Sequence, residues 1–361
     1  MKYRLAIIKS GFMSYYLKYF LTACKKNNIK VDLFTFEFCN EYSEYIENTY
    51  LLKSNYNPKN YKSKSDIEKE IKNLVNISDY DYFLTDCLGL SFCCNVFHNV
   101  TLHTRIKKDD NYIYGKILEL FHSKRLKAES IYYKDTPKNI VVSNILKEDY
   151  SVNCNINPKN ILVVYPGVNA ESENPTKRIE DNIFVFGSVN CGFTTKGGYN
   201  ILRALRIFNK KFPGKNVKIK MINPKYRKFS FLYFYLKLFK LDKTVEILPY
   251  YNNINEFYRE IDCLICASEF EAFGRIVTEA MINNVPVITG TNVGASDIIK
   301  DRVNGFIYKY DKKRYYNLAV KMNEIIENKE NLEKIKQKAF NTAQNLTLEN
   351  FAKNIFSFLY F

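Results

Sequence analysis

Residues 268–308 constrain the fold more than any other stretch. Their pattern predicts a loop, then a helix, then a strand, and another predicted strand directly precedes them. The apolar runs at 261–267 and 286–289 are typical of buried strands. Between them, residues 275–283 carry apolar side chains at helical spacing, so one face of this helix should pack on a sheet. The order strand, helix, strand indicates a parallel sheet. It places the loop 268–274 at the carboxyl edge, where open α/β sheets bind ligands.

The loop and the helix after it combine a glycine turn with two carboxylates. Gly274 allows a ligand close to the backbone and precedes unpaired helical N–H groups, which attract phosphate. Glu271 and Glu279 flank the turn with seven residues between them. A carboxylate only accepts hydrogen bonds, so it suits sugar hydroxyls better than phosphate. Together these features indicate a sugar nucleotide; the alternative is a solvated helix on which Glu279 merely pairs with Arg275.

The wider pattern allows a resemblance to be named. It consists of Glu271, Phe273, Gly274, Glu279, Ala280, Met281, Pro286, Val287 and Ile288, followed by Gly294, Asp297 and Gly305. This pattern resembles the E-x7-E signature of family 4 of the retaining glycosyltransferases. The resemblance implies an α/β protein of the GT-B fold, in which two Rossmann-like domains face each other across a cleft.

The same resemblance implies roles for single residues. Glu271 would contact hydroxyls of the donor sugar, and Glu279 would contact the ribose of the nucleotide. The backbone expected to bind the diphosphate comprises Ala272, Phe273, Gly274, Arg275 and Ile276.

The loop that opens the second domain supplies a further candidate. Lys196 and Gly197 match the Lys-Gly of the family, whose lysine contacts the donor diphosphate. Ser188 stands where the family usually has an arginine; Arg275 or a residue of the other domain compensates, or catalysis is weak. Tyr251, after the predicted strand at 245–248, is expected to line the pocket of the nucleotide base.

The amino-terminal half begins with a pattern that is typical of a Rossmann-type domain. The strand predicted at 3–8 leads to Gly11, but the remaining glycines of a dinucleotide-binding G-x-G-x-x-G are missing, which argues against a dehydrogenase. In the family this loop faces the cleft, so Gly11 is a candidate for donor binding. In the family, a histidine that faces the reacting sugar often follows the strand predicted here at 99–102. His103 is therefore a candidate catalytic residue, with a hydrogen-bonded histidine at a strand end as the alternative.

Length and composition agree with two domains. The chain has 361 residues, of which 46% are hydrophobic, enough for two cores. We expect an acceptor-binding domain at 1–170, a donor-binding domain at 171–345 and a helix at 346–361 that crosses back to the first domain. No apolar run approaches the roughly 20 residues of a membrane span, and the amino terminus predicts a strand rather than a secretory signal. A cytoplasmic protein is expected.

The net charge of +16 leaves three kinds of partner open: nucleic acid, an anionic membrane surface or phosphorylated substrates. A compositional drift of the whole chain toward lysine, asparagine, isoleucine and tyrosine is a fourth explanation. Residues 105–127 form a basic amphipathic pattern that suits either anionic lipid or a solvated helix face. The charge is therefore compatible with a peripheral position on the inner face of the cell membrane.

No metal site is predicted. The nine cysteines are interpreted as reduced core residues, because Cys263 and Cys266 lack a second ligand pair for zinc. Asp79 and Asp81 form a D-x-D that precedes its strand, at the wrong edge of a parallel sheet for a ligand.

The sequence thus predicts a retaining, metal-independent glycosyltransferase of hexosyltransferase type, acting in surface polysaccharide or glycolipid synthesis. Its expected donor is a nucleoside diphosphate sugar, a UDP-sugar rather than a GDP-sugar, and its acceptor a glycan or lipid-linked glycan. The predicted catalytic residues are His103, Lys196 and Glu271. A GT-B epimerase or phosphorylase is the alternative, and a basic nucleic-acid-binding protein is disfavoured. The donor sugar, acceptor, linkage and oligomeric state do not follow from the sequence.

Overall fold

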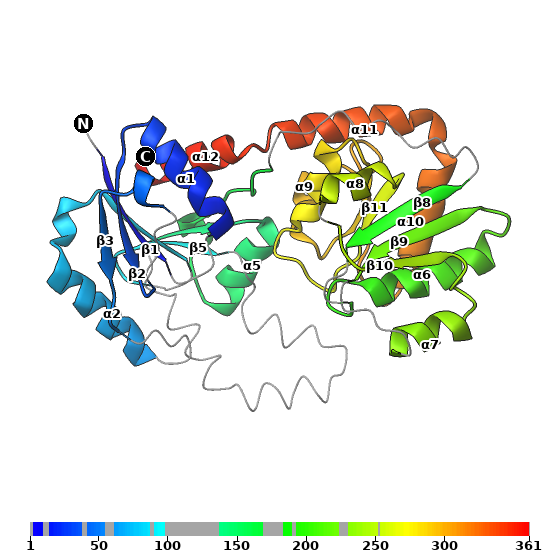
Figure 1. Cartoon of the computed structure of the whole chain (residues 1–361), viewed down its shortest axis with the longest axis horizontal. Helices are drawn as coiled ribbons and strands as arrows, with labels where there is room; N and C mark the ends of the chain where they lie inside the picture. The colour runs from blue at the N-terminus through cyan, green and yellow to red at the C-terminus, as the bar shows by residue number, and fades with distance from the viewer. Residues whose placement is uncertain are drawn as a thin grey trace. The chain divides into compact units, whose positions relative to one another are not determined.

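The computed structural model describes residues 3–9, 14–37, 42–54, 61–86, 90–97, 137–168, 183–189, 193–223, 230–251 and 253–360. Gly11 and His103 lie outside these ranges, as do residues 105–127. The chain divides into two compact units, one formed by Met1–Gly167 with Leu348–Phe361 and the other by Val168–Thr347 (Figure 1). Each unit contains its own parallel sheet. This confirms the predicted α/β class.

The first unit contains a seven-stranded parallel sheet of order β3-β2-β1-β4-β5-β6-β7. Its strands are β1 Arg4–Lys9, β2 Lys30–Thr35, β3 Asn48–Leu51, β4 Tyr82–Asp86, β5 Cys94–Phe97, β6 Lys138–Val141 and β7 Ile161–Val163. Its helices are α1 Ser14–Lys26, α2 Tyr61–Leu74, α5 Asn144–Asn153 and α12 Leu348–Tyr360, with 3-10 turns η1 Ser43–Tyr45, η2 Ile77–Asp79 and η3 Pro158–Asn160.

The alternation of side chains along β1 explains why helices cover both faces of this sheet. Leu5 and Ile7 belong to one core cluster, which includes residues of α1 and α12, whereas Ala6 and Ile8 belong to another, which includes residues of α2. All four are fully buried. Successive residues of a strand point to opposite faces, so a continuous apolar run requires cover on both sides.

The last helix of the chain belongs to the first unit. α12, drawn in red, lies beside α1 in Figure 1, and the rings of Phe20 and Phe356 are 5.0 Å apart. Lys138 of β6 donates a hydrogen bond of 2.8 Å to the carbonyl of Phe358 near the end of α12. These contacts tie the carboxyl-terminal segment to the core of the first unit.

The second unit contains a six-stranded parallel sheet of order β10-β9-β8-β11-β12-β13. Its strands are β8 Phe184–Val189, β9 Val217–Ile222, β10 Val245–Leu248, β11 Cys263–Cys266, β12 Val287–Gly290 and β13 Phe306–Tyr308. Its helices are α6 Gly198–Lys211, α7 Phe231–Leu238, α8 Ile254–Arg259, α9 Arg275–Ile282, α10 Arg314–Glu327 and α11 Lys329–Gln344, with the 3-10 turn η4 Gly294–Ile298. The order reverses at β8, so β8 and β11 form the switch point at whose carboxyl edge such sheets bind ligands.

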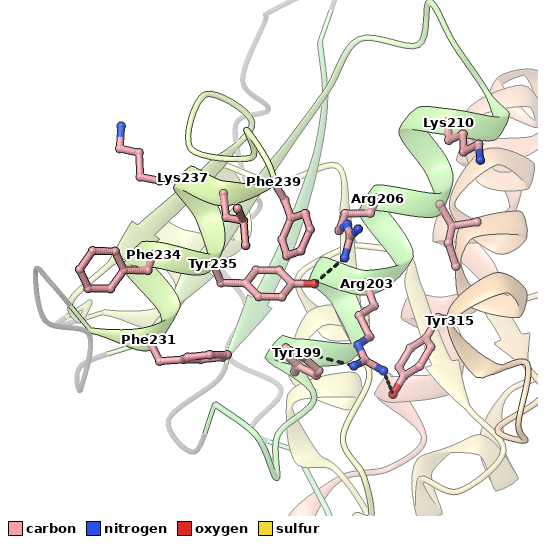
Figure 2. Close-up of a pocket in the computed structure, with 12 residues that line it drawn as sticks. Tyr199, Arg203, Arg206, Lys210, Phe231, Phe234, Tyr235, Lys237, Phe239 and Tyr315 are labelled. Carbon is pink, nitrogen blue, oxygen red and sulfur yellow. Dashed lines mark hydrogen bonds between the residues drawn. The ribbon is translucent and has the colours of Figure 1, made fainter.

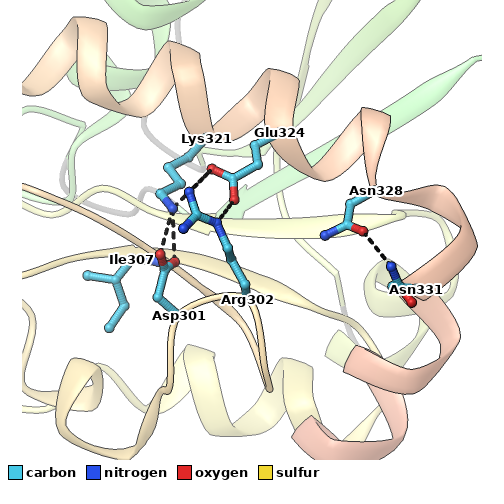
Figure 3. A network of polar contacts seen from close by, with 7 residues as sticks. All are labelled: Asp301, Arg302, Ile307, Lys321, Glu324, Asn328 and Asn331. Atoms are coloured by element: carbon cyan, nitrogen blue, oxygen red, sulfur yellow. Dashed lines mark hydrogen bonds and ion pairs between the residues drawn. The ribbon is translucent and has the colours of Figure 1, made fainter.

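A network of charged side chains connects the turn before β13 to α10 (Figure 3). Lys321 donates to Asp301 at 2.7 Å and lies 3.1 Å from Glu324, whose other oxygen accepts from the guanidinium of Arg302. Asp301 also accepts from the backbone N–H of Ile307 at 2.8 Å. Burial alone would raise the pKa of Glu324, but the hydrogen bonds from Arg302 and Lys321 outweigh it and hold that pKa below its usual value.

This network predicts a pH-dependent contribution to stability. Glu324→Gln should lower the free energy of unfolding by about 1 kcal/mol at neutral pH. The folded-state pKa lies below that of a glutamate in an unfolded chain, about 4.3. The contribution is therefore complete above that value and is lost as the pH falls through the folded pKa. Urea unfolding at about pH 7 and about pH 3 should show the gap between native and variant protein closing on acidification.

The control for this experiment is Glu327→Gln on the same helix. Glu327 pairs with Lys215 at 3.0 Å, but its side chain is 57% exposed. Because solvent screens such a pair, it contributes little to the stability of the folded protein, and the urea midpoint of unfolding should barely move. A gap for Glu324→Gln that stays constant from neutral to acidic pH would contradict the assignment.

Candidate functional site

Two loops at the carboxyl edge of the second sheet are held together by their backbones. The loop after β11 meets the loop after β8 where the N–H of Glu269 donates to the carbonyl of Thr195 at 3.0 Å. The side chain of Asn200, in the first turn of α6, donates to the carbonyl of Ala267 at 2.9 Å. The two sequence stretches that predicted donor-binding residues are therefore in direct contact.

Gly197 makes this contact possible. Its φ is +77°, and a Cβ atom at this position would lie 1.8 Å from the carbonyl oxygen of Ala267. An L-residue rarely adopts such a φ, and no side chain fits in the space that remains. Glycine is therefore required here for the backbone geometry, and its position fixes that of the preceding Lys196.

The structure brings Lys196 and Glu271 together. The ammonium of Lys196 lies 2.9 Å and 2.7 Å from the two carboxylate oxygens of Glu271. The lysine side chain is 43% exposed and the glutamate side chain 22%. A cation suited to a diphosphate and an acceptor suited to hydroxyls thus lie side by side within reach of solvent.

The second glycine with a positive φ in the site is Gly274, which directly precedes α9 and has a φ of +96°. Among the described residues, no side chain caps the amino end of this helix. A Cβ on Gly274 would lie 3.0 Å from Val293 and 3.2 Å from the Cγ of Glu271, so a larger residue would press on the glutamate. The loop is fixed from its other side as well, since the N–H of Gly294 donates to the carbonyl of Glu271 at 2.9 Å.

The other predicted residues of this loop lie around the helix start. Phe273 is buried, and Ala272 and Ile276 are half-buried. The N–H of Ala295 donates to the carbonyl of Phe273, and the hydroxyl of Tyr258 donates to the carbonyl of Ile276 at 3.4 Å. The backbone expected to bind the diphosphate is therefore braced by two neighbouring segments.

Glu279 forms the helical ion pair that the sequence offered as the alternative interpretation. Arg275 donates to one of its oxygens at 3.2 Å, and the hydroxyl of Tyr258 lies 3.3 Å from the other. Burial raises the pKa of Tyr258, and the charge of Glu279 raises it further, so the hydroxyl stays protonated as a donor. The glutamate side chain is 25% exposed. Its contact with ribose stays a prediction.

Tyr251 and Ser188 take part in structural contacts. The hydroxyl of Tyr251 donates to Glu260 at 2.9 Å, and the same carboxylate oxygen accepts from Lys220. Burial and the hydrogen bond to Glu260 raise the pKa of Tyr251.

Ser188 is 1% exposed and donates to the carbonyl of Ile265 at 3.1 Å, so it connects β8 to β11. Arg275, offered as a substitute for the missing arginine, is paired with Glu279.

Three side chains that position the site were not predicted from the sequence. Asn292 donates to the carbonyls of Ser268 and Glu269 at 2.8 Å and 2.7 Å, and so supports the loop that carries Glu271. The hydroxyl of Tyr310 donates to the carboxylate of Glu269. Tyr258 supports α9 as described above. Asn292 closely follows the end of β12, and its place at the carboxyl edge of the sheet is the signal that could have identified it.

Two models of protein families match the chain. Residues 13–172 match Glycosyltransferase Family 4, and residues 169–342 match Glycosyl transferases group 1. The chain belongs to the glycosyltransferases. This confirms the predicted enzyme class. Comparison with curated protein sequences gives no match.

Solved structures similar to this glycosyltransferase confirm the GT-B fold. A glycosyltransferase from Rickettsia africae ESF-5 is 18% identical over 99% of this chain and 98% of that one, with a TM-score of 0.72. HepE of Anabaena, solved in complex with UDP, is 17% identical over 99% of both chains, with a TM-score of 0.70. The lipopolysaccharide outer core galactosyltransferase WaaB is 14% identical over 98% of this chain and 99% of that one, with a TM-score of 0.73.

Two kinds of feature are absent from the described part of the glycosyltransferase. No helix there has both the length and the apolar character that a membrane span needs. No group of three or more His, Cys, Asp or Glu side chains lies close enough there to hold a metal ion. Cys263 and Cys266 are both buried in β11, and Asp81 accepts a hydrogen bond of 2.7 Å from the backbone N–H of Arg4.

Proposed function

We propose that this glycosyltransferase moves a hexose from a nucleoside diphosphate sugar, a UDP-sugar in particular, to a glycan or lipid-linked glycan. The observation that carries the proposal is the ion pair between Lys196 and Glu271 beside the glycine turn into α9. HepE has been solved with UDP and with UDP-glucose, and WaaG is involved in lipopolysaccharide biosynthesis. These relatives support a UDP-sugar donor and a role in surface polysaccharide or glycolipid synthesis.

In the proposed reaction, Lys196 neutralises the diphosphate as it leaves. The bond between the anomeric carbon and the diphosphate oxygen breaks, and negative charge develops on that oxygen. The ammonium and the N–H groups at the start of α9 stabilise this charge, so the reaction proceeds without a metal ion. On donor binding, Lys196 moves its hydrogen bonds from Glu271 to the diphosphate, which leaves Glu271 to accept from hydroxyls of the sugar.

Retention at the anomeric carbon follows if the acceptor attacks from the face that the diphosphate leaves. The acceptor oxygen forms the new bond to the anomeric carbon, and its proton passes to the leaving oxygen. His103 is proposed to face the reacting sugar, Gly11 and Tyr251 to contribute to donor binding, and Glu279 to hold the ribose. The enzyme is proposed to act in the cytoplasm, peripheral to the inner face of the membrane.

The donor can be tested by thermal unfolding in the presence of UDP, GDP, ADP and their sugars. A ligand at about 100 times its Kd stabilises the folded state by about 2.7 kcal/mol, which raises the melting temperature of a domain of this size by several degrees. We expect the largest rise with a UDP-sugar. No rise with any nucleotide would contradict the proposal.

A second assay separates transfer from epimerisation, which a GT-B site of this kind could also perform. The protein is incubated with a UDP-sugar in the absence of an acceptor, and the sugar is analysed. A transferase should leave the donor intact or hydrolyse it slowly. Conversion into an epimer would overturn the proposed reaction while leaving the donor site in place.

A further inference from the structure

A groove of about 940 Å³ lies outside the loops that carry Lys196 and Glu271. It is formed by α6, α7 and the first turn of α10, and Figure 2 shows aromatic and basic side chains from these helices gathered around it. Tyr199 at the amino end of α6 and Lys210 near its carboxyl end mark its extent along that helix.

The groove is strongly cationic. Its lining includes Arg203, Arg206, Lys210 and Lys237, and no carboxylate, although Lys237 donates to the nearby Asp242 at 2.6 Å. Arg203 donates to the hydroxyls of Tyr199 and Tyr315 at 3.1 Å and 3.2 Å. Arg206 lies 3.4 Å from the centre of the Phe239 ring and 3.5 Å from the hydroxyl of Tyr235. Among the described residues, no carboxylate pairs with either guanidinium, so both charges are available to an anionic ligand.

Beside the groove, α7 presents apolar side chains to solvent. Phe231 is 75% exposed, Phe234 57% and Leu238 74%. Their spacing of three and four residues places them on one side of the helix, while Leu232, Tyr235 and Leu236 are buried on the other. The three exposed side chains also line the edge of the groove on the side of α7. A short helix with exposed aromatic residues beside a cationic groove has the composition of an interfacial membrane-binding element.

We propose that this groove and the exposed side of α7 form a docking surface for an anionic phospholipid bilayer. The apolar side chains of α7 enter the interface between headgroups and acyl chains, and Arg203, Arg206 and Lys210 meet the phosphates. This inference takes one element from the proposed function, which is the peripheral location of the enzyme at the membrane. It places that contact in the second unit.

Three other occupants fit the groove less well. A neutral glycan needs acceptors for its hydroxyls, but no Asp, Glu, Asn or Gln side chain lines the groove. A second copy of the chain, docked symmetrically, would bring Arg203, Arg206 and Lys210 of both copies together. Single-stranded nucleic acid would stack its bases on the rings in the groove, but the aliphatic side chain of Leu238, which is 74% exposed, offers no such stacking surface.

The test measures sedimentation of the full chain with vesicles of phosphatidylcholine alone or mixed with phosphatidylglycerol. The apolar variant is Phe231→Ser/Phe234→Ser/Leu238→Ser, and the charge variant is Arg206→Glu/Lys210→Glu. The control is Leu51→Ser/Val152→Ser, which removes apolar side chains that are 52% and 71% exposed in the first unit. All substituted residues lie at the surface, so the fold should survive; the melting temperature checks this.

We expect the native protein and the control to sediment with anionic vesicles in a salt-sensitive manner and to stay in the supernatant when the vesicles are neutral. The apolar and charge variants should each lose at least about tenfold in vesicle affinity. Their thermal response to UDP should be unchanged, which separates this inference from the donor site. Equal binding by native protein and both variants would overturn the inference. A shift from dimer to monomer in the apolar variant would overturn it in favour of a second copy.

Discussion

Replacing Lys196 with alanine should slow sugar transfer at least about 100-fold while the protein remains folded, since a lost donor to developing negative charge typically has this effect. The lysine is 43% exposed and its ion-pair partner is a surface-accessible carboxylate, so stability depends little on the pair. Loss of the ammonium also leaves the charge of Glu271 unbalanced beside the diphosphate. Initial rates of transfer, with the melting temperature as a check on folding, measure the effect.

Substitutions of the two partners should have different effects on nucleotide binding. Lys196→Ala should abolish both transfer and the thermal response to UDP. Glu271→Gln and Glu271→Ala should abolish transfer but keep the response to UDP, which carries no sugar for the glutamate to hold. The control is Lys215→Ala, which removes a lysine that is 34% exposed and pairs with Glu327 at 3.0 Å. Undiminished turnover in Lys196→Ala or Glu271→Ala would refute the assignment.

The second large effect is expected at Gly197. Gly197→Ala should lower the free energy of unfolding of the second unit by about 3 kcal/mol, because an alanine at positive φ costs about 1–2 kcal/mol and overpacking adds a similar amount. Its Cβ would lie 1.8 Å from the carbonyl oxygen of Ala267, so the backbone must shift and Lys196 with it. Transfer should fall in parallel. Urea unfolding and initial rates measure the two losses.

Gly214 provides the matched control, because it has a φ of +82° and no atom lies within 4 Å of the point that a Cβ would occupy. Gly214→Ala therefore carries the conformational cost alone, about 1–2 kcal/mol, with transfer unchanged. The difference between the two variants isolates the contact with Ala267. Equal unfolding midpoints for both would show that the loops separate easily, against the geometry described above.

The sequence predicted elements better than contacts. The strands around the loop 268–274 and the helix that follows it are present as β11, β12 and α9, because periodicity and turn chemistry are local properties. The proximity of Lys196 and Glu271 could be inferred only through the resemblance, since 75 positions separate them in the chain. Periodicity carries no information about such a distant pair.

Side-chain direction was the other property that the sequence did not reveal. Ser188 stands where the family usually has an arginine, yet its side chain is buried and connects two strands. Tyr251 was expected at a base pocket, and its hydroxyl is held by Glu260, nine residues further on. Phe231, Phe234 and Leu238 of α7 face solvent, which the apolar composition of this segment does not show. Which face of a helix is covered depends on tertiary packing.

The close approach of Gly197 to Ala267 also limits how this enzyme can diversify. An insertion or deletion in either loop would pull the other out of place, because the carbonyl of Ala267 accepts from Asn200 and leaves no room beside Gly197. Changes in donor preference should therefore arise from single substitutions around a constant loop length. Attempts to retarget the enzyme by grafting longer loops at this edge should yield misfolded protein, whereas point-mutant libraries should stay soluble.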